Sequence, residues 1–200
     1  MFNHAFGLLT HPGDQWGRLA ELPAPSMRNM AVFPAIMAIL PAVAWYYGTT
    51  RIGWTVGDGE PIRLTEDSAL ALILLFYFTM VTSVAVIGYA IHWMSRTYGA
   101  NSSLAKGLAI AGFTATPLFI TGAVGFYPIL WLDMLIGVVA VCWSVYLMYL
   151  GIPIVMKIPE ERGFLFSSAV LAICLVIMVC ILVGSVILWD FGYAPAFTDA

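Results

Sequence analysis

The 200-residue sequence has very little charge. Only 10% of its residues are Asp, Glu, Lys or Arg, whereas 62% are hydrophobic. Ordinary soluble domains carry about 25% charged and roughly 45–50% apolar residues. A soluble fold of this size would leave much of its apolar surface in contact with water. The scarcity of charge therefore excludes a soluble globular protein and predicts a membrane protein.

Cysteine, histidine and known catalytic patterns are also scarce. The three cysteines, Cys142, Cys174 and Cys180, show no Cys-x-x-Cys spacing and are typical of small apolar packing residues. No metalloprotease, nucleophile-elbow or nucleotide-binding pattern occurs. We therefore expect no enzyme activity, no metal and no cofactor, and we identify no small-molecule substrate. The eight basic residues are too few and too scattered to bind nucleic acid.

Long uncharged runs make up most of the chain. A helix needs about 20 apolar residues to cross roughly 30 Å of hydrocarbon, and five runs are long enough. We predict spans at about 29–50, 68–94, 107–127, 130–156 and 163–189. No linker or internal repeat separates them. We expect one all-α membrane domain over residues 1–200, a five-transmembrane-helix bundle.

Lysine and arginine are distributed unevenly between the predicted loops, and the richer side marks the cytoplasm. Six of the eight lie on one side: Arg18, Arg28, Arg96, Lys106, Lys157 and Arg162. Arg51 and Arg63 lie on the other side, in a loop that Asp58 and neighbouring acids make net acidic. We expect a multi-pass protein of the inner (cytoplasmic) membrane, with its N-terminus cytoplasmic and its C-terminus outside.

Residues 1–28, before the first span, contain a short amphipathic pattern. In "THPGDQWGRLAE", Trp16 and Leu19 recur at helical spacing opposite Arg18 and Glu21. Pro12 suits an early helical position. We predict a short amphipathic helix at the cytoplasmic interface. It either senses membranes or partners, or it is an ordered lead-in that packs under the bundle.

The third span contains helix breakers, in the stretch "GFTATPLFITGAVGFYP" at 112–128. Proline has no N–H and crowds the carbonyl four residues back, so Pro117 should free the Phe113 carbonyl and kink the helix near mid-span. Thr114 and Thr116 are close by in the sequence and could donate to this carbonyl, and a neighbouring helix or an ordered water could do so as well. The small residues Gly112 and Gly122 allow another helix to approach closely.

The first span repeats this pattern, with Pro34 and Pro41 seven residues apart on nearly the same face. Broken helices also line many transport pathways, usually beside polar or ionisable groups at mid-depth. Two residues could form a polar site. Asp133 is either an interfacial acid at the start of the fourth helix or an acid turned inward. His92 is either a structural histidine or part of a proton relay.

Three tracts resemble the Yip family, the Ypt- or Rab-interacting membrane proteins, and in particular its small bacterial branch. They are "LLTHPGDQWGRLAE", "YGANSSLAKGLAIAGFTATPLFITG" and "WSVYLMYLGIPIVMKIPEERG". The resemblance implies a five-helix bundle with a cytoplasmic N-terminus. It also implies roles in architecture or partner contact for Gly112, Phe113 and Pro117 and for Tyr146, Tyr149 and Gly151.

Eukaryotic members of that family are linked to vesicle trafficking and small GTPases. Their acidic Asp-Leu-Tyr-Gly-Pro tract is absent here, so a GTPase partner is not carried over. We interpret the chain as a non-enzymatic membrane scaffold of Yip type, active in membrane organisation or assembly. Membrane lipids, a second copy of the chain or another membrane protein are its expected partners. The alternative is a small channel or transporter that uses the proline-kinked helices.

Overall fold

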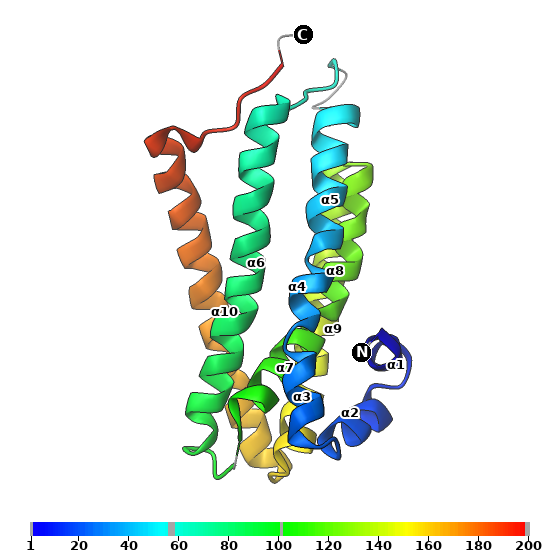
Figure 1. Ribbon diagram of the computed structural model, residues 1–200, viewed down its shortest axis with the longest axis vertical. Coiled ribbons are helices and arrows are strands. Elements are labelled where there is room, and N and C mark those ends of the chain that lie inside the picture. The colour runs from blue at the N-terminus through cyan, green and yellow to red at the C-terminus, as the bar shows by residue number, and fades with distance from the viewer. Residues whose placement is uncertain (1, 56–58, 101, 199–200) are drawn as a thin grey trace.

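The computed structural model describes residues 2–55, 59–100 and 102–198, with the exception of the side chains of residues 24, 25 and 28. The predictions for Asp58 and for the Arg28 side chain fall outside this part. The described residues are helical, with two isolated β-bridges, Trp54–Ile62 and Leu64–Phe197. Figure 1 shows long helices side by side along the long axis, with short N-terminal helices packed near one end. The predicted all-helical class is confirmed.

The helices follow one another in this order: α1 (Phe2–Thr10), α2 (Pro12–Ala20), α3 (Ala24–Met30), α4 (Phe33–Met37), α5 (Ile39–Tyr47), a π-helical turn η1 (Gly48–Ile52), α6 (Glu66–Ser95), α7 (Leu104–Thr114), α8 (Thr116–Thr121), a 3-10 turn η2 (Gly122–Phe126), α9 (Leu130–Met156), α10 (Glu160–Leu188) and a final π-helical turn η3 (Trp189–Tyr193).

Three helices, α6, α9 and α10, are each long and apolar enough to cross a membrane, and the bent pair α7–α8 makes a fourth span if it is counted as one. The predicted first span, 29–50, is divided among the end of α3, α4, α5 and η1. Each piece is too short to cross alone. Pro34 lies in the first turn of α4, where its missing N–H costs no hydrogen bond. The structure thus supports three to four spans, and the fifth stays a prediction.

The third predicted span bends where the sequence predicts it. Helix α7 ends at Thr114 and α8 begins at Thr116, and the two segments meet at 41°. Pro117 lies in the first turn of α8, so it cannot donate to the carbonyl of Phe113. The N–H of Ala115 points to the carbonyls of Ala111 and Phe113 instead. The predicted kink is confirmed.

The two ends of the bundle differ in charge. At one end, α6 and α9 end and α7 and α10 begin; this basic end carries Arg96, Lys106, Lys157 and Arg162. Arg18 joins them, because α2 packs on the last turns of α9. The opposite end carries Arg51 and Arg63, and Arg51 forms an ion pair with Glu66 at 2.9 Å. The fold therefore groups the described basic residues as the sequence grouped them. Which end faces the cytoplasm stays a prediction.

The C-terminal residues close the opposite end. After η3, the N–H of Thr198 donates to the Arg63 carbonyl at 3.0 Å, and the Thr65 N–H donates to the Ala196 carbonyl at 2.9 Å. The Ala196 N–H donates to the Ser68 hydroxyl at 3.0 Å, at the start of α6. Residues 194–198 are thereby attached to the segment that joins η1 to α6.

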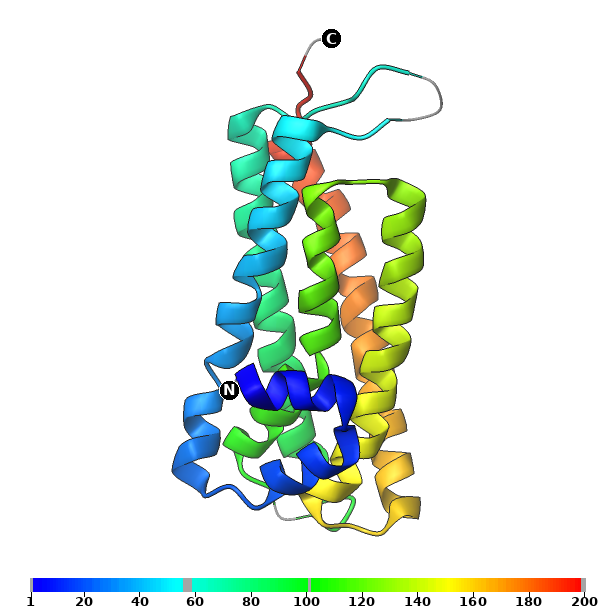
Figure 2. The ribbon, with the colours of Figure 1, turned by 90° about the vertical axis from the view of Figure 1, so that its right-hand side faces the viewer.

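The N-terminal segment forms two helices against the bundle. Figure 2 shows α1 running across the long helices instead of along them. Its Ala5 and Leu8 are buried. Helix α2 covers the predicted amphipathic stretch and buries Trp16 and Leu19. Its position at a membrane interface stays a prediction.

Candidate interaction site

Glycines of the third predicted span contact prolines of the first. We call Gly112, Gly122, Pro34 and Pro41 the Gly–Pro interface. A Cβ atom added to Gly112 would lie 2.5 Å from Cγ of Pro34, and one added to Gly122 would overlap Cβ of Pro41. Both prolines are buried. The two helices therefore approach as closely as glycine permits, which is how helices associate where lipid provides no hydrophobic drive.

The bend beside this interface is filled by aromatic packing. Phe113 is buried and stacks on Phe33, with ring centroids 4.8 Å apart and planes at 26°. From α1, the ring of His4 meets Phe113 edge-on at 6.5 Å. Contrary to one of the expectations from the sequence, the hydroxyl groups of Thr114 and Thr116 do not donate to the Phe113 carbonyl. Their hydroxyl groups have no hydrogen-bond partner among the described residues.

Gly151 near the end of α9 is covered by the N-terminal segment. A Cβ there would lie 2.5 Å from the Trp16 indole, and that side chain is only 1% exposed. Two residues later, Pro153 of α9 packs on Gly163 of α10, where a Cβ would lie 2.6 Å from the proline ring. Because Gly151 has no side chain, the Trp16 indole of α2 can pack directly on α9.

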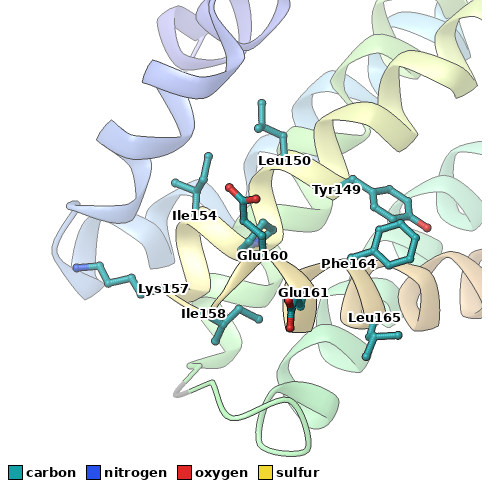
Figure 3. A pocket seen from close by; sticks show the side chains of 10 residues that line it. Tyr149, Leu150, Ile154, Lys157, Ile158, Glu160, Glu161, Phe164 and Leu165 are labelled. Carbon is teal, nitrogen blue, oxygen red and sulfur yellow. The ribbon is translucent and has the colours of Figure 1, made fainter.

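Tyr149 lines an open groove where α9 ends and α10 begins, with a volume of about 1080 Å³ (Figure 3). Its hydroxyl lies 2.9 Å from the Ser168 hydroxyl, and its ring is tilted against Phe164 at 5.4 Å. Glu160 and Glu161 at the start of α10 also line the groove. The groove thus combines an aromatic wall with two acids at the basic end of the bundle.

The remaining predicted site residues lie apart from one another. Tyr146 is 48% exposed on α9, tilted against Trp143 at 5.3 Å. Asp133 lies in the first turn of α9, at the opposite end of the bundle, and neither carboxylate oxygen has a described partner. His92 lies in the last turn of α6, at the basic end. The two residues of the predicted polar site therefore do not come together.

Outside the predicted spans, His4 has a shifted pKa. Its Nδ1 is hydrogen bonded to the Gln15 side chain of α2. Burial, and to a smaller degree the positive charge of Arg18, lowers the pKa of His4 below its ordinary value. This contact could not be predicted from the sequence. His4 and Gln15 lie on two separate short helices, and no periodicity in the sequence shows how those helices pack on each other.

Comparison with known proteins agrees with this architecture. Residues 6–181 match the Yip1 domain. The chain belongs to the Yip1 family. Inner membrane protein YohC of Escherichia coli strain K12 is 40% identical over 191 residues, which is 96% of this chain and 98% of that protein. YohC of E. coli O6:H1 (strain CFT073) has the same identity and coverage. No solved structure matches the chain.

Family membership and the apolar helices together make this chain a helical, multi-pass membrane protein. The family resemblance found in the sequence is thus confirmed. Gly112, Phe113, Thr116, Pro117 and Gly151 are buried and Gly122 is half-buried. Tyr146 is exposed and Tyr149 is half-buried. A role of these residues in partner contact stays a prediction.

Proposed function

We propose that this Yip1-family chain is a non-enzymatic scaffold of the bacterial inner membrane, which associates with a second copy or with another membrane protein. Its relative is named an inner membrane protein. In this proposal the broken segment α4–α5 completes five spans in a single domain, with the N-terminus cytoplasmic, the C-terminus outside and α2 at the cytoplasmic interface. The unequal basic residues at the two ends support this orientation.

The observation that carries the proposal is the separation of the ionisable groups along the helices. Asp133 and His92 lie at opposite ends of the bundle. The cavities found between the long helices are lined mainly by apolar side chains. A carrier of charged solutes normally needs fixed polar groups at mid-membrane to offset the cost of dehydrating its cargo. The described residues offer no such series of groups.

Partner contact would use the exposed aromatic residues of α9. Tyr146 and Trp143 form an exposed pair at one face of the helix, whereas the small residues of the Gly–Pro interface are already occupied. Aromatic side chains contribute large contact areas with little loss of conformational freedom. A second copy or a different membrane protein could therefore pack on this face.

The assembly test is purification in native lipid, followed by mass spectrometry of the intact complexes. We expect Tyr146→Ala to reduce recovery of the second copy or partner. Tyr89→Ala is the matched control, because Tyr89 on α6 is at least as exposed as Tyr146 but lies outside the predicted site. Equal loss of assembly in both variants, or in neither, would contradict a role for Tyr146.

The alternative, a small channel or transporter, has a separate test. We expect liposomes that contain the pure protein to show no ion or solute flux above protein-free liposomes. Flux that Asp133→Asn abolishes would replace the scaffold with the channel. Reporters fused after Gly99 and after Ala200 test the orientation: we expect a cytoplasmic and an outside signal respectively, and the reverse pair would overturn it.

A further inference from the structure

The open groove of Figure 3, which we call the α9–α10 groove, changes in polarity along its length. One end lies where α9 stops and α10 starts, and it is lined by three exposed charged residues, Lys157, Glu160 and Glu161. The groove continues along α9 to Leu150, about 9 Å before the end of the helix at 1.5 Å per residue. A molecule that fills it therefore needs a charged end and an apolar body.

The groove has the orientation of a lipid beside the bundle. Helix α9 is long and apolar enough to cross a membrane, so its end marks the level where hydrocarbon gives way to headgroups. The charged end of the groove lies at this level, and the apolar end lies deeper. Phe164 and Leu165 of α10 line the groove and are 60% and 59% exposed. A lipid could therefore enter from the bilayer without changing its orientation.

The charged groups of the groove do not neutralise one another. Lys157 has a left-handed backbone just after α9, and Figure 3 shows its side chain directed away from Glu160 and Glu161. None of the three forms an ion pair with another residue in the part of the chain that the structure describes. The groove thus offers one cation and two carboxylates as separate binding points.

This pattern of charge distinguishes between headgroups. An anionic headgroup would be attracted by Lys157 but repelled by two carboxylates, and a purely cationic one would be repelled by Lys157. A zwitterionic headgroup can place its phosphate at Lys157 and its amine at Glu160 and Glu161. A primary ammonium fits carboxylates better than a trimethylammonium does, because its N–H groups donate charge-assisted hydrogen bonds.

We propose that the α9–α10 groove binds a zwitterionic phospholipid with a primary ammonium headgroup. The phosphate lies at Lys157, the ammonium at Glu160 and Glu161, and one acyl chain along Leu150 and Leu165. The inference is independent of the proposed scaffold function, because the groove lies within one chain and needs neither a second copy nor a partner protein.

The test is native mass spectrometry of the full chain, with bound lipid counted on the monomer. The probes are dioleoyl phospholipids with phosphoethanolamine, phosphocholine or phosphoglycerol headgroups at equal concentration. We expect the phosphoethanolamine lipid to be retained several-fold more than the other two. Glu160→Gln should lower its retention about fivefold, the upper range for an exposed ion pair. Lys157→Gln should lower the retention of both zwitterionic lipids.

Asp67→Asn is the matched control for Glu160→Gln. Asp67 is an exposed acid in the first turn of α6, as Glu160 is in the first turn of α10, but it does not line the groove. It should leave lipid retention unchanged. Thermal unfolding should be close to that of the parent in all three variants, because each replaces an exposed side chain.

A diazirine on the acyl chain of the phosphoethanolamine lipid locates the binding site. We expect it to label residues 149–154 of α9 and 164–165 of α10. Labelling confined to other lipid-facing positions, or unchanged retention in Glu160→Gln, would overturn the proposal. The same holds if the phosphocholine or phosphoglycerol lipid is retained as strongly as the phosphoethanolamine lipid. Tighter retention of an amphipathic lysine–leucine peptide would assign the groove to a basic protein segment instead.

Discussion

The Gly–Pro interface and the second half of α10 show two ways in which an apolar helix meets its neighbours. At the interface, Gly112 and Gly122 bring backbones into contact with Pro34 and Pro41, so that no side-chain atom could be added. In α10, a Cβ at Gly184 would meet nothing within 4 Å, and most large side chains after Val170 are exposed. The same residue type therefore has a structural role in one region and not in the other.

The difference indicates what holds helices together in lipid. Apolar surface alone gives no preference for a neighbouring helix over an acyl chain, so association depends on close contact and hydrogen bonds. Segments α4, α5, α7 and η2 have such close contacts. Beyond Val170, the described part of α10 has no fully buried residue, although Leu171 and Cys174 still pack on the core, and its groove with α6 remains open.

The largest effect should come from Gly112→Leu. The new side chain would overlap the Pro34 ring, and overpacking of this kind costs about 3 kcal/mol. The free energy of unfolding, measured by detergent titration in mixed micelles, should fall by that amount. The matched change Gly184→Leu should stay within about 0.5 kcal/mol of the parent. A comparable loss in both variants would remove the distinction between the two regions.

A smaller effect is expected from Pro117→Ala. Pro117 lies in the first turn of α8, where proline is tolerated, so its removal brings little gain in helix propensity. Partial straightening of the 41° bend would shift Gly122 away from Pro41. We expect a loss of about 1 kcal/mol, because displaced packing outweighs the restored hydrogen bond. Distances between spin labels on α7 and η2 that match the parent would show that packing, not proline, holds the bend.

The attachment of α1 beside Phe113 should depend on pH. The pKa of His4 is lowered by burial, so the docked helix binds the proton less well than the free helix does. Docking should be complete above the ordinary value of about 6.5 and should weaken as the pH falls below it, until the lowered pKa is reached. The protection factors of the α1 amides, which are exchange rates corrected for the intrinsic effect of pH, should therefore fall in acid. In His4→Gln these protection factors should be independent of pH, and an unchanged pH response would exclude His4 as the cause.

The smallest effect is expected from Asp133→Asn. Asp133 lies away from the Gly–Pro interface, and its carboxylate has no described hydrogen-bond partner to lose. The free energy of unfolding should change by no more than about 0.5 kcal/mol. A loss as large as that of Gly112→Leu would place Asp133 among the residues that hold the bundle together.

The sequence predicts the long helices well, because charges and helix breakers mark their ends. Helix α9 has the predicted bounds, 130–156, between Pro128 and the left-handed Lys157. A bend at Pro117 is expected from the missing N–H and from the steric demand of the proline ring. These features depend on local chemistry, which a single sequence contains.

The contacts between segments could not be predicted in the same way. The sequence shows that positions 112, 122 and 151 are glycines. It does not show that prolines pack on Gly112 and Gly122, or that Trp16 packs on Gly151. The uncharged helix α1 has no pattern that would place it across the bundle beside Phe113. The cavity beside the bend between α7 and α8 is lined by residues of five helices, so no local pattern indicates it.

The attachment of residues 194–198 has a mechanical consequence for α10. Both ends of this helix are fixed, one by the contact of Gly163 with Pro153 and the other through the bonds to Arg63 and Thr65. These attachments restrict rigid-body tilting of α10 away from the bundle, whereas its middle is restrained only by its contacts with α6 and α9. Deletion of residues 194–200 would release the C-terminal end of α10, and the groove between α10 and α6 could then widen from that end.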